Sequence, residues 1–551
     1  INLRTGNNEK REYAFMLGAL GTEISLEGPF SKDSKASYLI NYRYSTLAIL
    51  KPFLADFLGD FTPKYQDLTF KIKIPTEKYG IFSLFGLGGI NDISNEAIKD
   101  ETKWVEDNDD ENYMEKNSLG VFGLSHLIPL SESSYLKSTF AITADAYNDE
   151  FSVLIPDEDY RADFRFKNKF ENKTYKTQFL LNTKLNKRHT LRLGGIHSVL
   201  NFNLFGKAKN TETNSLETFF DDNKTTYLYQ VYGQWKWRFH TNFTLHTGLH
   251  TSFLSLNDTY SIDPRIALQW AFSKNRTFAF SIGKHSQHQH PSSYLVEKTS
   301  DNSIRTLPNL NLEFTKAMHY VLSYNEQFTN SWLLKTEVYY QSLYDVPIQK
   351  DPEKTIGSLI NSAAIWDVYN SGEITSEGTG FNYGIDITIE KSFFNGYYAL
   401  LTTSLYDSKY IPSNKKTYNT RYNGNYLLNI LYGKEWNIGK NNNLFSLNGR
   451  FSLRGGNRYT ETDVEKSILN GQQEIFHDRA FQLQYPAYSR IDFGVKYSIN
   501  RKKATHAFSI DLQNVLNKQN VRSINYNVDT NTFRTTYQSG LIPNFNYRIT
   551  F

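Results

Sequence analysis

Residues 444–454 read LFSLNGRFSLR, a stretch in which apolar and polar side chains alternate. One face of an extended strand would carry Phe445, Leu447, Phe451 and Leu453, and the other Ser446, Asn448, Arg450, Ser452 and Arg454. Residues 331–342 and 505–515 alternate in the same way. The polar faces carry charged and amide groups, which are too wet for the core between two stacked sheets. The pattern therefore predicts strands with lipid on one side and a water-filled lumen on the other.

The composition joins many aromatic residues to a low mean hydropathy. Of the 551 residues, 15% are aromatic and 21% are charged, and the mean hydropathy is −0.54. A soluble core needs aliphatic bulk, whereas a membrane barrel needs one apolar face per strand and aromatic residues at both interfaces. No run of about 18 apolar residues occurs, so a membrane-spanning helix is not expected. A bilayer can then be crossed only by a closed barrel, in which every strand edge is paired.

Charge and motifs exclude several other classes of protein. The formal net charge of +4 is small and evenly spread, so nucleic acid is not expected as a partner. The absence of cysteine excludes disulfides, thiolate metal sites and a cysteine nucleophile. There is no phosphate-binding glycine loop, HExxH helix or GxSxG elbow, so neither an enzyme nor a bound cofactor is predicted.

Short and long connections alternate along the chain. Short, turn-rich connections occur at 31–35, 76–78, 186–189, 240–242, 273–276, 395–396, 439–443 and 500–503. Long polar stretches occur at 92–115, 148–170, 202–222, 285–315, 345–380, 455–485 and 516–540. Counting strands between them gives about 22. We therefore predict an all-β fold, in which residues 1–551 form one transmembrane antiparallel β-barrel of the bacterial outer membrane, with short periplasmic turns and long extracellular loops.

The last strand alternates up to the final residue. Phe545, Tyr547, Ile549 and Phe551 share one face. An aromatic strand that ends in Phe resembles the C-terminal signal by which outer-membrane barrels are recognised for insertion. The alternative is an ordinary edge strand that happens to end in Phe.

Beyond the alternation, several short stretches carry a family resemblance. They are Ile1–Thr5 followed by Gly6–Asn8, Leu26–Pro29, Tyr38–Arg43, Ile262–Arg265, Pro291–Ser293, Glu337–Tyr340, Tyr383–Asp386, Gly433–Trp436, Arg490–Asp492, Asp511–Asn517 and Gly540–Pro543. In this order and spacing they resemble TonB-dependent outer-membrane receptors of the Bacteroidota type.

The resemblance implies parts that this sequence does not contain. In that family an N-terminal plug fills the lumen and a TonB box couples it to the inner membrane, and both would precede Ile1. We therefore expect a barrel without its plug domain. The partners implied are outer-membrane lipid, TonB through the missing plug segment, and a surface lipoprotein or other outer-membrane subunits.

The function predicted is active import of a scarce solute, with siderophore-bound iron, a vitamin, a peptide and a glycan all left open. One alternative is a transporter-like barrel that serves as a structural subunit of a larger outer-membrane complex. The other is a passive porin.

Three histidines, His285, His288 and His290, are the candidate ligand-binding residues. Imidazoles two or three residues apart can bind a transition metal, but a polar surface loop rich in His and Gln explains them without any ligand, and the metal stays unknown. The inward cations expected to attract an anionic solute, or to be neutralised by nearby carboxylates, are Arg450, Arg454, Lys335 and Lys184.

Two further loop features can be interpreted either as ligand-binding sites or as ordinary loop structure without a ligand. Apolar residues near helical spacing in 47–61 predict a loop helix that contacts a ligand, a partner or the membrane, or that packs over the barrel mouth. The acidic runs Glu106–Glu111 and Asp157–Asp159 offer carboxylates to calcium, or are solvated loop charge.

Overall fold

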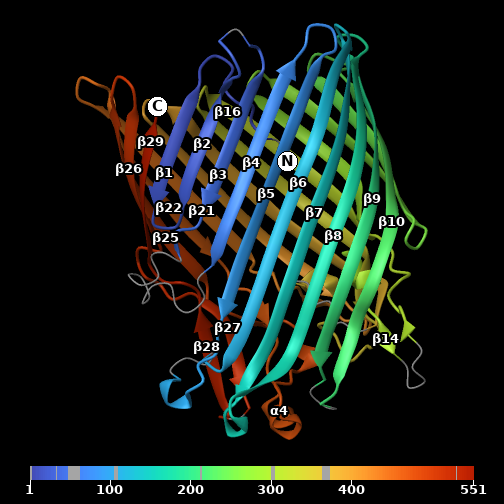
Figure 1. Ribbon diagram of the computed structural model, residues 1–551. Helices are drawn as coiled ribbons and strands as arrows, with labels where there is room; N and C mark the ends of the chain where they lie inside the picture. Colours follow the sequence, from blue (N-terminus) through green and yellow to red (C-terminus); the bar gives the residue numbers. More distant parts are fainter. Residues whose placement is uncertain are drawn as a thin grey trace.

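The chain forms one closed antiparallel β-barrel (Figure 1). The computed structural model describes residues 3–32, 34–47, 63–104, 109–210, 214–299, 305–362, 373–528 and 530–551. The barrel closes where Ala14 of β1 (Glu12–Gly18) lies opposite Thr550 of β29 (Ile542–Thr550). The main sheet has 23 strands, but the two-residue β20 (Tyr418–Asn419) pairs with β19 beyond the end of β21, so there are 22 positions around the barrel. The prediction of about 22 strands is confirmed.

The remaining barrel strands follow one another in chain order. They are β2 (Thr22–Pro29), β3 (Ser37–Tyr44), β4 (Lys64–Pro75), β5 (Ile81–Asn95), β6 (Glu111–Ser131), β7 (Ser134–Ile155), β8 (Arg161–Lys184), β9 (His189–Lys209), β10 (Leu216–Trp237), β11 (Phe243–Leu254), β12 (Thr259–Ser273), β13 (Arg276–Gln287), β16 (Thr315–Thr329), β17 (Trp332–Gln349), β18 (Ile374–Phe394), β19 (Tyr397–Ile411), β21 (Tyr426–Ile438), β22 (Asn443–Arg454), β25 (Tyr488–Asn500) and β26 (Thr505–Gln513).

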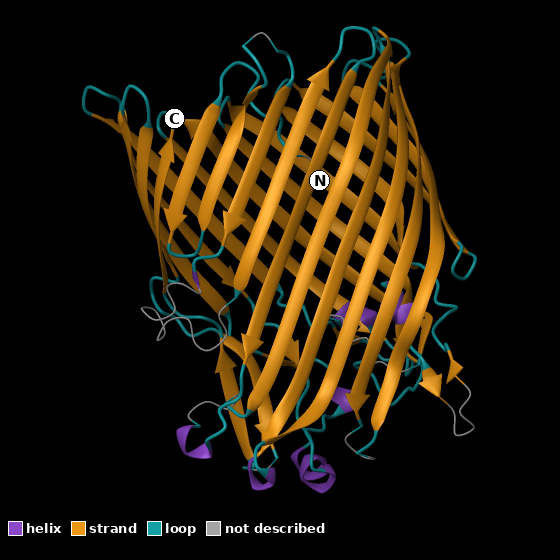
Figure 2. Cartoon of the chain, in the orientation of Figure 1, coloured by secondary structure: helices purple, strands orange, loops and turns teal. Residues whose placement is uncertain are grey.

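Short turns lie at one end of the barrel and loops with their own structure at the other (Figure 2). At the short end, β18 and β19 are joined by Asn395 and Gly396, whose φ angles of 56° and 77° suit these two residue types in a tight hairpin. The loop end holds the helices α2 (Pro291–Tyr294) and α4 (Val464–Asn470). It also holds the small strands β14 (Lys298–Thr299), β15 (Arg305–Thr306), β23 (Arg458–Tyr459), β24 (Leu483–Gln484), β27 (Val521–Asn527) and β28 (Thr532–Tyr537), and the 3-10 turns Glu101–Lys103, Pro156–Glu158, Leu359–Asn361 and His477–Arg479.

The outward face of the barrel wall is apolar over the thickness of a bilayer. On β10 the outward side chains run from Trp237 through Val231 to Tyr227, and Val231 is 62% exposed. Residues 227–237 match the roughly 9–11 residues that a tilted strand needs to cross the hydrocarbon. Near the short-turn end, Trp235 and Trp237 lie 5.3 Å apart between ring centroids and begin a belt of aromatic contacts. Such belts mark the membrane interface. None of the helices in the described ranges is long and apolar enough to cross a bilayer.

Two of the long loops expected from the sequence are strand instead. Residues 148–170 and 202–222 largely continue the barrel strands β7 to β10, which reach 21–24 residues, so that only 156–160 separate β7 from β8 and 210–215 separate β9 from β10. These strands rise past the membrane into water, where the outward face no longer needs apolar residues. The alternation that predicted strands elsewhere therefore fades, although the backbone pairing continues.

The polarity of the wall inverts where these strands leave the membrane. Tyr175, Val199 and Tyr227 form one outward row across β8, β9 and β10. Two residues further along, the outward row is Lys173, Asn201 and Thr225, and the Thr225 hydroxyl donates to Asn201 at 2.8 Å. Beyond it, large apolar side chains are buried on the inward side, Phe170, Phe202, Leu204 and Phe220 among them. We take the step between these two rows as the outer boundary of the bilayer.

The final strand has the predicted facing. Phe545, Tyr547 and Ile549 lie opposite Ile510, Phe508 and His506 on β26, and Phe545 is 54% exposed on the outer face. Their role as an insertion signal stays a prediction. At the other end of the chain, Arg4 forms a salt bridge of 2.6 Å with Glu27, and Lys71 donates to the carbonyl of Leu3 at 2.6 Å. The first described residues are therefore held against the lumen side of β2 to β4.

Candidate functional site

The inner wall between β9 and β16 has a hollow of about 490 Å³, here called the lumen hollow. Six consecutive barrel strands each contribute one basic or imidazole side chain to it: Arg192, Lys236, His246, Arg265, His285 and His319. Inward positions without side chains at Gly248 and Gly283 leave its floor open. Both glycines belong to one hydrogen-bonded row that runs from Arg192 to His319.

The permanent cations of the lumen hollow have no carboxylate partner within the described ranges. Arg192 donates to the amide oxygen of Asn182 at 2.9 Å, and the hollow has no acidic residue among its described lining. Two cations elsewhere on the inner wall are instead paired, Arg43 with Asp67 at 2.8 Å and Lys335 with Glu337 at 2.8 Å. The lumen hollow is therefore a patch of net positive charge suited to a negatively charged group.

A second basic patch lies on the inner wall at β21 to β25. Arg450 and Arg454 face the lumen as predicted and line a cavity of about 280 Å³. The Arg450 Nε donates to Ser452 at 3.1 Å, and the Arg454 guanidinium lies 5.0 Å from the ring centroid of Tyr488. Of the other predicted cations, Lys335 is neutralised by Glu337, and Lys184 lies exposed at the short-turn end of β8.

The three candidate histidines do not converge. His285 lies in the lumen hollow with its ring 4.6 Å from that of His319. His288 is hydrogen-bonded through Nδ1 to the Gln289 carbonyl at 2.7 Å. The His290 side chain instead accepts the backbone N–H of Ser292 and caps α2. In the described part of the chain, no group of three metal-ligating side chains forms.

Asp263 fixes the end of β13, where the loop that carries His288 and His290 begins. Its neighbour Pro264 has no N–H, and the β12–β13 ladder begins only at the next residue, Arg265 opposite Gly283. The fully buried Asp263 carboxylate bridges the resulting gap, because it accepts the Ser286 hydroxyl at 2.6 Å and lies 3.5 Å from His250 Nδ1. This contact positions the end of β13.

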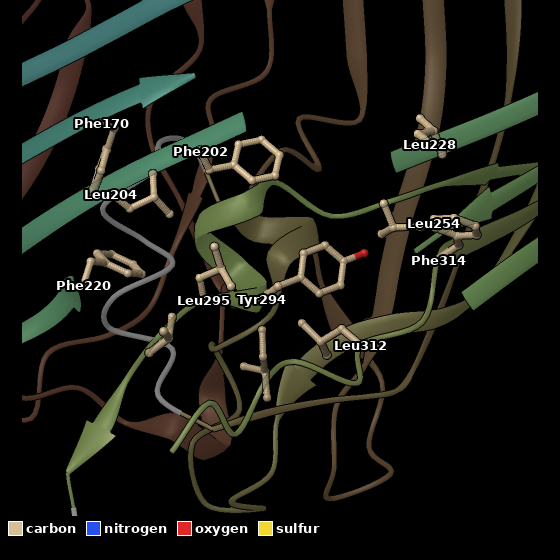
Figure 3. Packing of buried hydrophobic residues seen from close by; sticks show 12 residues of the cluster. Phe170, Phe202, Leu204, Phe220, Leu228, Leu254, Tyr294, Leu295, Leu312 and Phe314 are labelled. Atoms are coloured by element: carbon tan, nitrogen blue, oxygen red, sulfur yellow. The ribbon is translucent and has the colours of Figure 1, made fainter. Parts of the chain in front are cut away.

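In the loop between β13 and β16, Tyr294 and Leu295 lie against apolar side chains of the neighbouring strands (Figure 3). Tyr294 and Leu295 of this loop are 1% and 0% exposed. They pack on inward apolar side chains from the outer ends of the neighbouring strands, and burial raises the pKa of Tyr294 to about 12. The packed residues from the strands are Phe170, Phe202, Leu204, Phe220, Leu228, Leu254 and Ile374, and the loop itself adds Val296, Leu312 and Phe314. We call this set the mouth core.

The loops on the other side of the mouth form a second packed cluster. Tyr410, fully buried, packs with Tyr418 and Phe481, and its hydroxyl donates to the Thr355 carbonyl at 2.8 Å. His477 accepts the Thr355 hydroxyl through its carbonyl. Burial and the nearby Lys466 lower the pKa of the His477 imidazole below its ordinary value. Residues of three long loops are thus held together.

The other two loop features considered as ligand sites add no binding site in the described residues. The expected helix at 47–61 and part of the acidic run at 106–111 lie outside the described residues. Asp157 and Asp159 lie in the short connection after β7, where Glu158 instead pairs with Arg161 at 2.5 Å.

Sequence reasoning missed the lumen hollow. Its six side chains come from residues 192–319, and only the strand register brings them together. The signal available was that all six fall on the polar face of an alternating strand.

Fold and site together define a transmembrane barrel with a polar, locally basic lumen and loops that fold over its outer mouth. The family model described as TonB dependent receptor-like, beta-barrel matches residues 51–517. This chain belongs to that family of outer-membrane β-barrels. No curated protein matches its sequence.

Solved structures with the same fold are receptors and a transporter. The ferric-catecholate import receptor Fiu from E. coli K12 has a TM-score of 0.70 at 8% identity, over 99% of this chain and 82% of Fiu. The pyoverdine receptor FpvA from Pseudomonas aeruginosa PAO1 has a TM-score of 0.70 at 11% identity, over 100% and 79%. The copper transporter OprC has a TM-score of 0.65 at 10% identity, over 100% and 81%. Likeness at such identities concerns the fold alone.

Proposed function

We propose that this barrel serves the TonB-dependent import of an anionic solute across the outer membrane. The observation that carries the proposal is the lumen hollow, where Arg192, Lys236 and Arg265 lie on the transport path without described carboxylate partners. A polar wall that keeps three cations unneutralised attracts anions, because low-dielectric walls focus the field into the lumen. Arg450 and Arg454 extend the same charge to the opposite part of the wall.

Energy coupling rests on the family. TonB and a plug are the partners that a TonB-dependent receptor barrel uses, and we infer both for this protein. The structural neighbours include a ferric-catecholate import receptor, a receptor bound to pyoverdine and a copper transporter, which supports a metal chelate as the solute class. Negatively charged chelates suit the charge of the lumen hollow, whereas free copper cations do not.

The test is uptake by cells that depend on this protein. A deletion strain carrying the full-length gene would receive labelled ferric chelates of negative and of zero net charge, with and without a protonophore. We expect uptake of the anionic chelate that stops when the proton gradient is lost. Uptake that ignores the protonophore would favour the passive porin, and no uptake of any solute would favour the structural subunit.

Variants connect that uptake to the lumen hollow. Changing Arg192 and Arg265 together to Gln should lower the uptake rate of the anionic chelate roughly tenfold, at the low end of electrostatic steering. The matched control changes Lys335 and Glu337 together to Gln, which removes an inner-wall ion pair without altering net charge. Equal uptake by both variants would contradict the anionic solute.

A further inference from the structure

The lipid-facing side of β4 to β8 contains a groove of about 820 Å³, here called the outer groove. Its floor is a row of small residues, Gly88, Gly120 and Ala144, which lie opposite one another on β5, β6 and β7. Leu68 precedes this row on β4, and Lys173 follows it on β8. The row from Leu68 to Lys173 thus crosses five adjacent strands, and its small residues occupy the middle three.

The alternation of the strands places this floor on the outside of the barrel. Leu68, in the same row, is 42% exposed among the outward apolar side chains. Phe122 lies two residues from Gly120 on the same face and is 47% exposed. The lumen-facing side of the wall is different here, since Asp67 of β4 pairs there with Arg43 of β3. Acyl chains, not lumen water, therefore fill the outer groove.

Aromatic side chains form the wall of the groove toward the membrane centre. The Phe70 ring lies over Gly86, where an added Cβ would approach it to 2.4 Å, and it is 6.4 Å from the Phe122 ring. The wall therefore rises beside the floor of small residues. The result is a depression that fits a chain rather than a flat surface that fits another barrel.

The groove ends at the outer boundary of the bilayer on a cation. Lys173 is the first outward polar residue beyond Tyr175 on β8, and it has no ion pair in the described ranges. Glu171 nearby is already paired with Lys169 at 2.9 Å. Because the strands are tilted (Figure 1), the row from Leu68 to Lys173 slopes toward the loop end. An apolar channel thus leads to an amine at the level of the lipid head groups.

We propose that the outer groove binds a phosphorylated lipid of the outer leaflet, with an acyl chain on the glycine floor and a phosphate at the Lys173 ammonium. Apolar contact along the chain and charge attraction at the head group are the two terms that make a lipid site specific. Neither term depends on the solute that the barrel carries, so this site is independent of the proposed function.

The test measures lipid retained by the full-length protein purified in mild detergent. Native mass spectrometry would count bound lipid A and, in parallel, a phosphate-free lipid with the same acyl chains. Gly120→Ile should cut retained lipid A at least fivefold. The substitution is sterically easy, because an added Cβ meets only the Ala144 carbonyl at 3.9 Å. The control Gly195→Ile fills another outward glycine, where an added Cβ meets only the Gln230 carbonyl at 3.7 Å, and should retain lipid normally.

A second pair of variants tests the phosphate contact separately. Lys173→Gln should lower retention of lipid A but not of the phosphate-free lipid, whereas Lys207→Gln, on the outward face farther from the membrane, should change neither. Equal retention by Gly120→Ile and Gly195→Ile would overturn the site. Loss of a bound partner protein from Gly120→Ile, with lipid retained, would also overturn the site. An unfolding temperature equal to that of the wild type would show that each variant is folded.

Discussion

The strands β8 to β10 contain two regions with opposite construction. Within the membrane, Phe179 and Val231 point outward and are 53% and 62% exposed, while Gln178 and Gln230 point inward. Above it, Phe170 and Phe220 point inward and are 1% and 0% exposed, while outward Asn203 donates to Glu171 at 3.0 Å. Backbone pairing runs through both regions without a break in β8–β9.

This inversion shows that the surroundings, and not the strand, decide which face is apolar. Lipid outside and water inside require an apolar exterior in the membrane. Above the membrane, water lies outside and the β13–β16 loop lies inside, so burial is available only on the inner face. The mouth core thus has the polarity of a water-soluble protein, with apolar side chains inside and polar side chains outside, although it is built on the ends of membrane strands.

The largest expected effect removes a side chain from the mouth core. Phe220→Ala deletes a fully buried ring that lies 5.5 Å from Phe170, and should cost about 3–5 kcal/mol of local stability. Hydrogen exchange of the outer ends of β9 and β10 and of residues 291–296 would measure it. The control Phe179→Ala removes a lipid-facing ring and should leave exchange in these segments unchanged.

A charge on the outer face should have a somewhat smaller effect that depends on the region. Phe179→Lys places an ammonium in the bilayer and should destabilise the barrel by about 2–4 kcal/mol. Asn203→Lys makes the same kind of change on the outward face above the boundary and should be close to neutral. Denaturant unfolding of barrels refolded into vesicles would compare them. Equal losses would mean that the boundary is misplaced.

The smallest expected effect is a pH dependence in the loops. Because burial lowers the pKa of His477, docked loops hold its neutral form. Above about pH 6.5, imidazole is neutral in docked and undocked loops alike, and docking has its full strength. As pH falls below that value, the undocked state takes up the proton more readily, and docking weakens until the lowered pKa is reached. Protease cleavage in 455–487 should therefore rise between pH 6.5 and 5.

His477→Gln should abolish this rise. Glu474 does not interfere in that window, because Asn470 and Gln472 hold its pKa below the ordinary value of 4.5. Cleavage that rises equally in the variant would assign the effect to another group.

The barrel was predictable because lipid imposes a simple pattern. Segments such as 444–454 and 505–515 alternate cleanly, and both are strands in the structure. Prediction failed at 148–170 and 202–222, where the apolar side chains lie on the inward face, as Phe220 does on β10, while Tyr227 within the membrane faces outward. A search of the sequence that expects the apolar residues to stay on the same face of a strand interprets such a change as the end of the strand.

The candidate site was less accessible from sequence. His285, His288 and His290 are neighbours in the chain, yet they take a wall position, a loop contact and a helix cap. Arg192 and His319 are 127 positions apart and share one row of the sheet because each intervening hairpin fixes its register. Turn lengths set that register, so a predicted turn that is wrong by one residue moves every inward residue of the next strand to the outward face.

The boundary between Tyr175 and Lys173 is tested most directly by cysteine labelling, since the chain has no cysteine of its own. Single variants Phe179→Cys, Lys169→Cys and Phe170→Cys in intact cells would meet a membrane-impermeant thiol reagent. We predict rapid labelling at 169 alone, with 179 shielded by lipid and 170 by the mouth core. Labelling of 179 at the rate of 169, or of 170 ahead of both, would contradict the inversion.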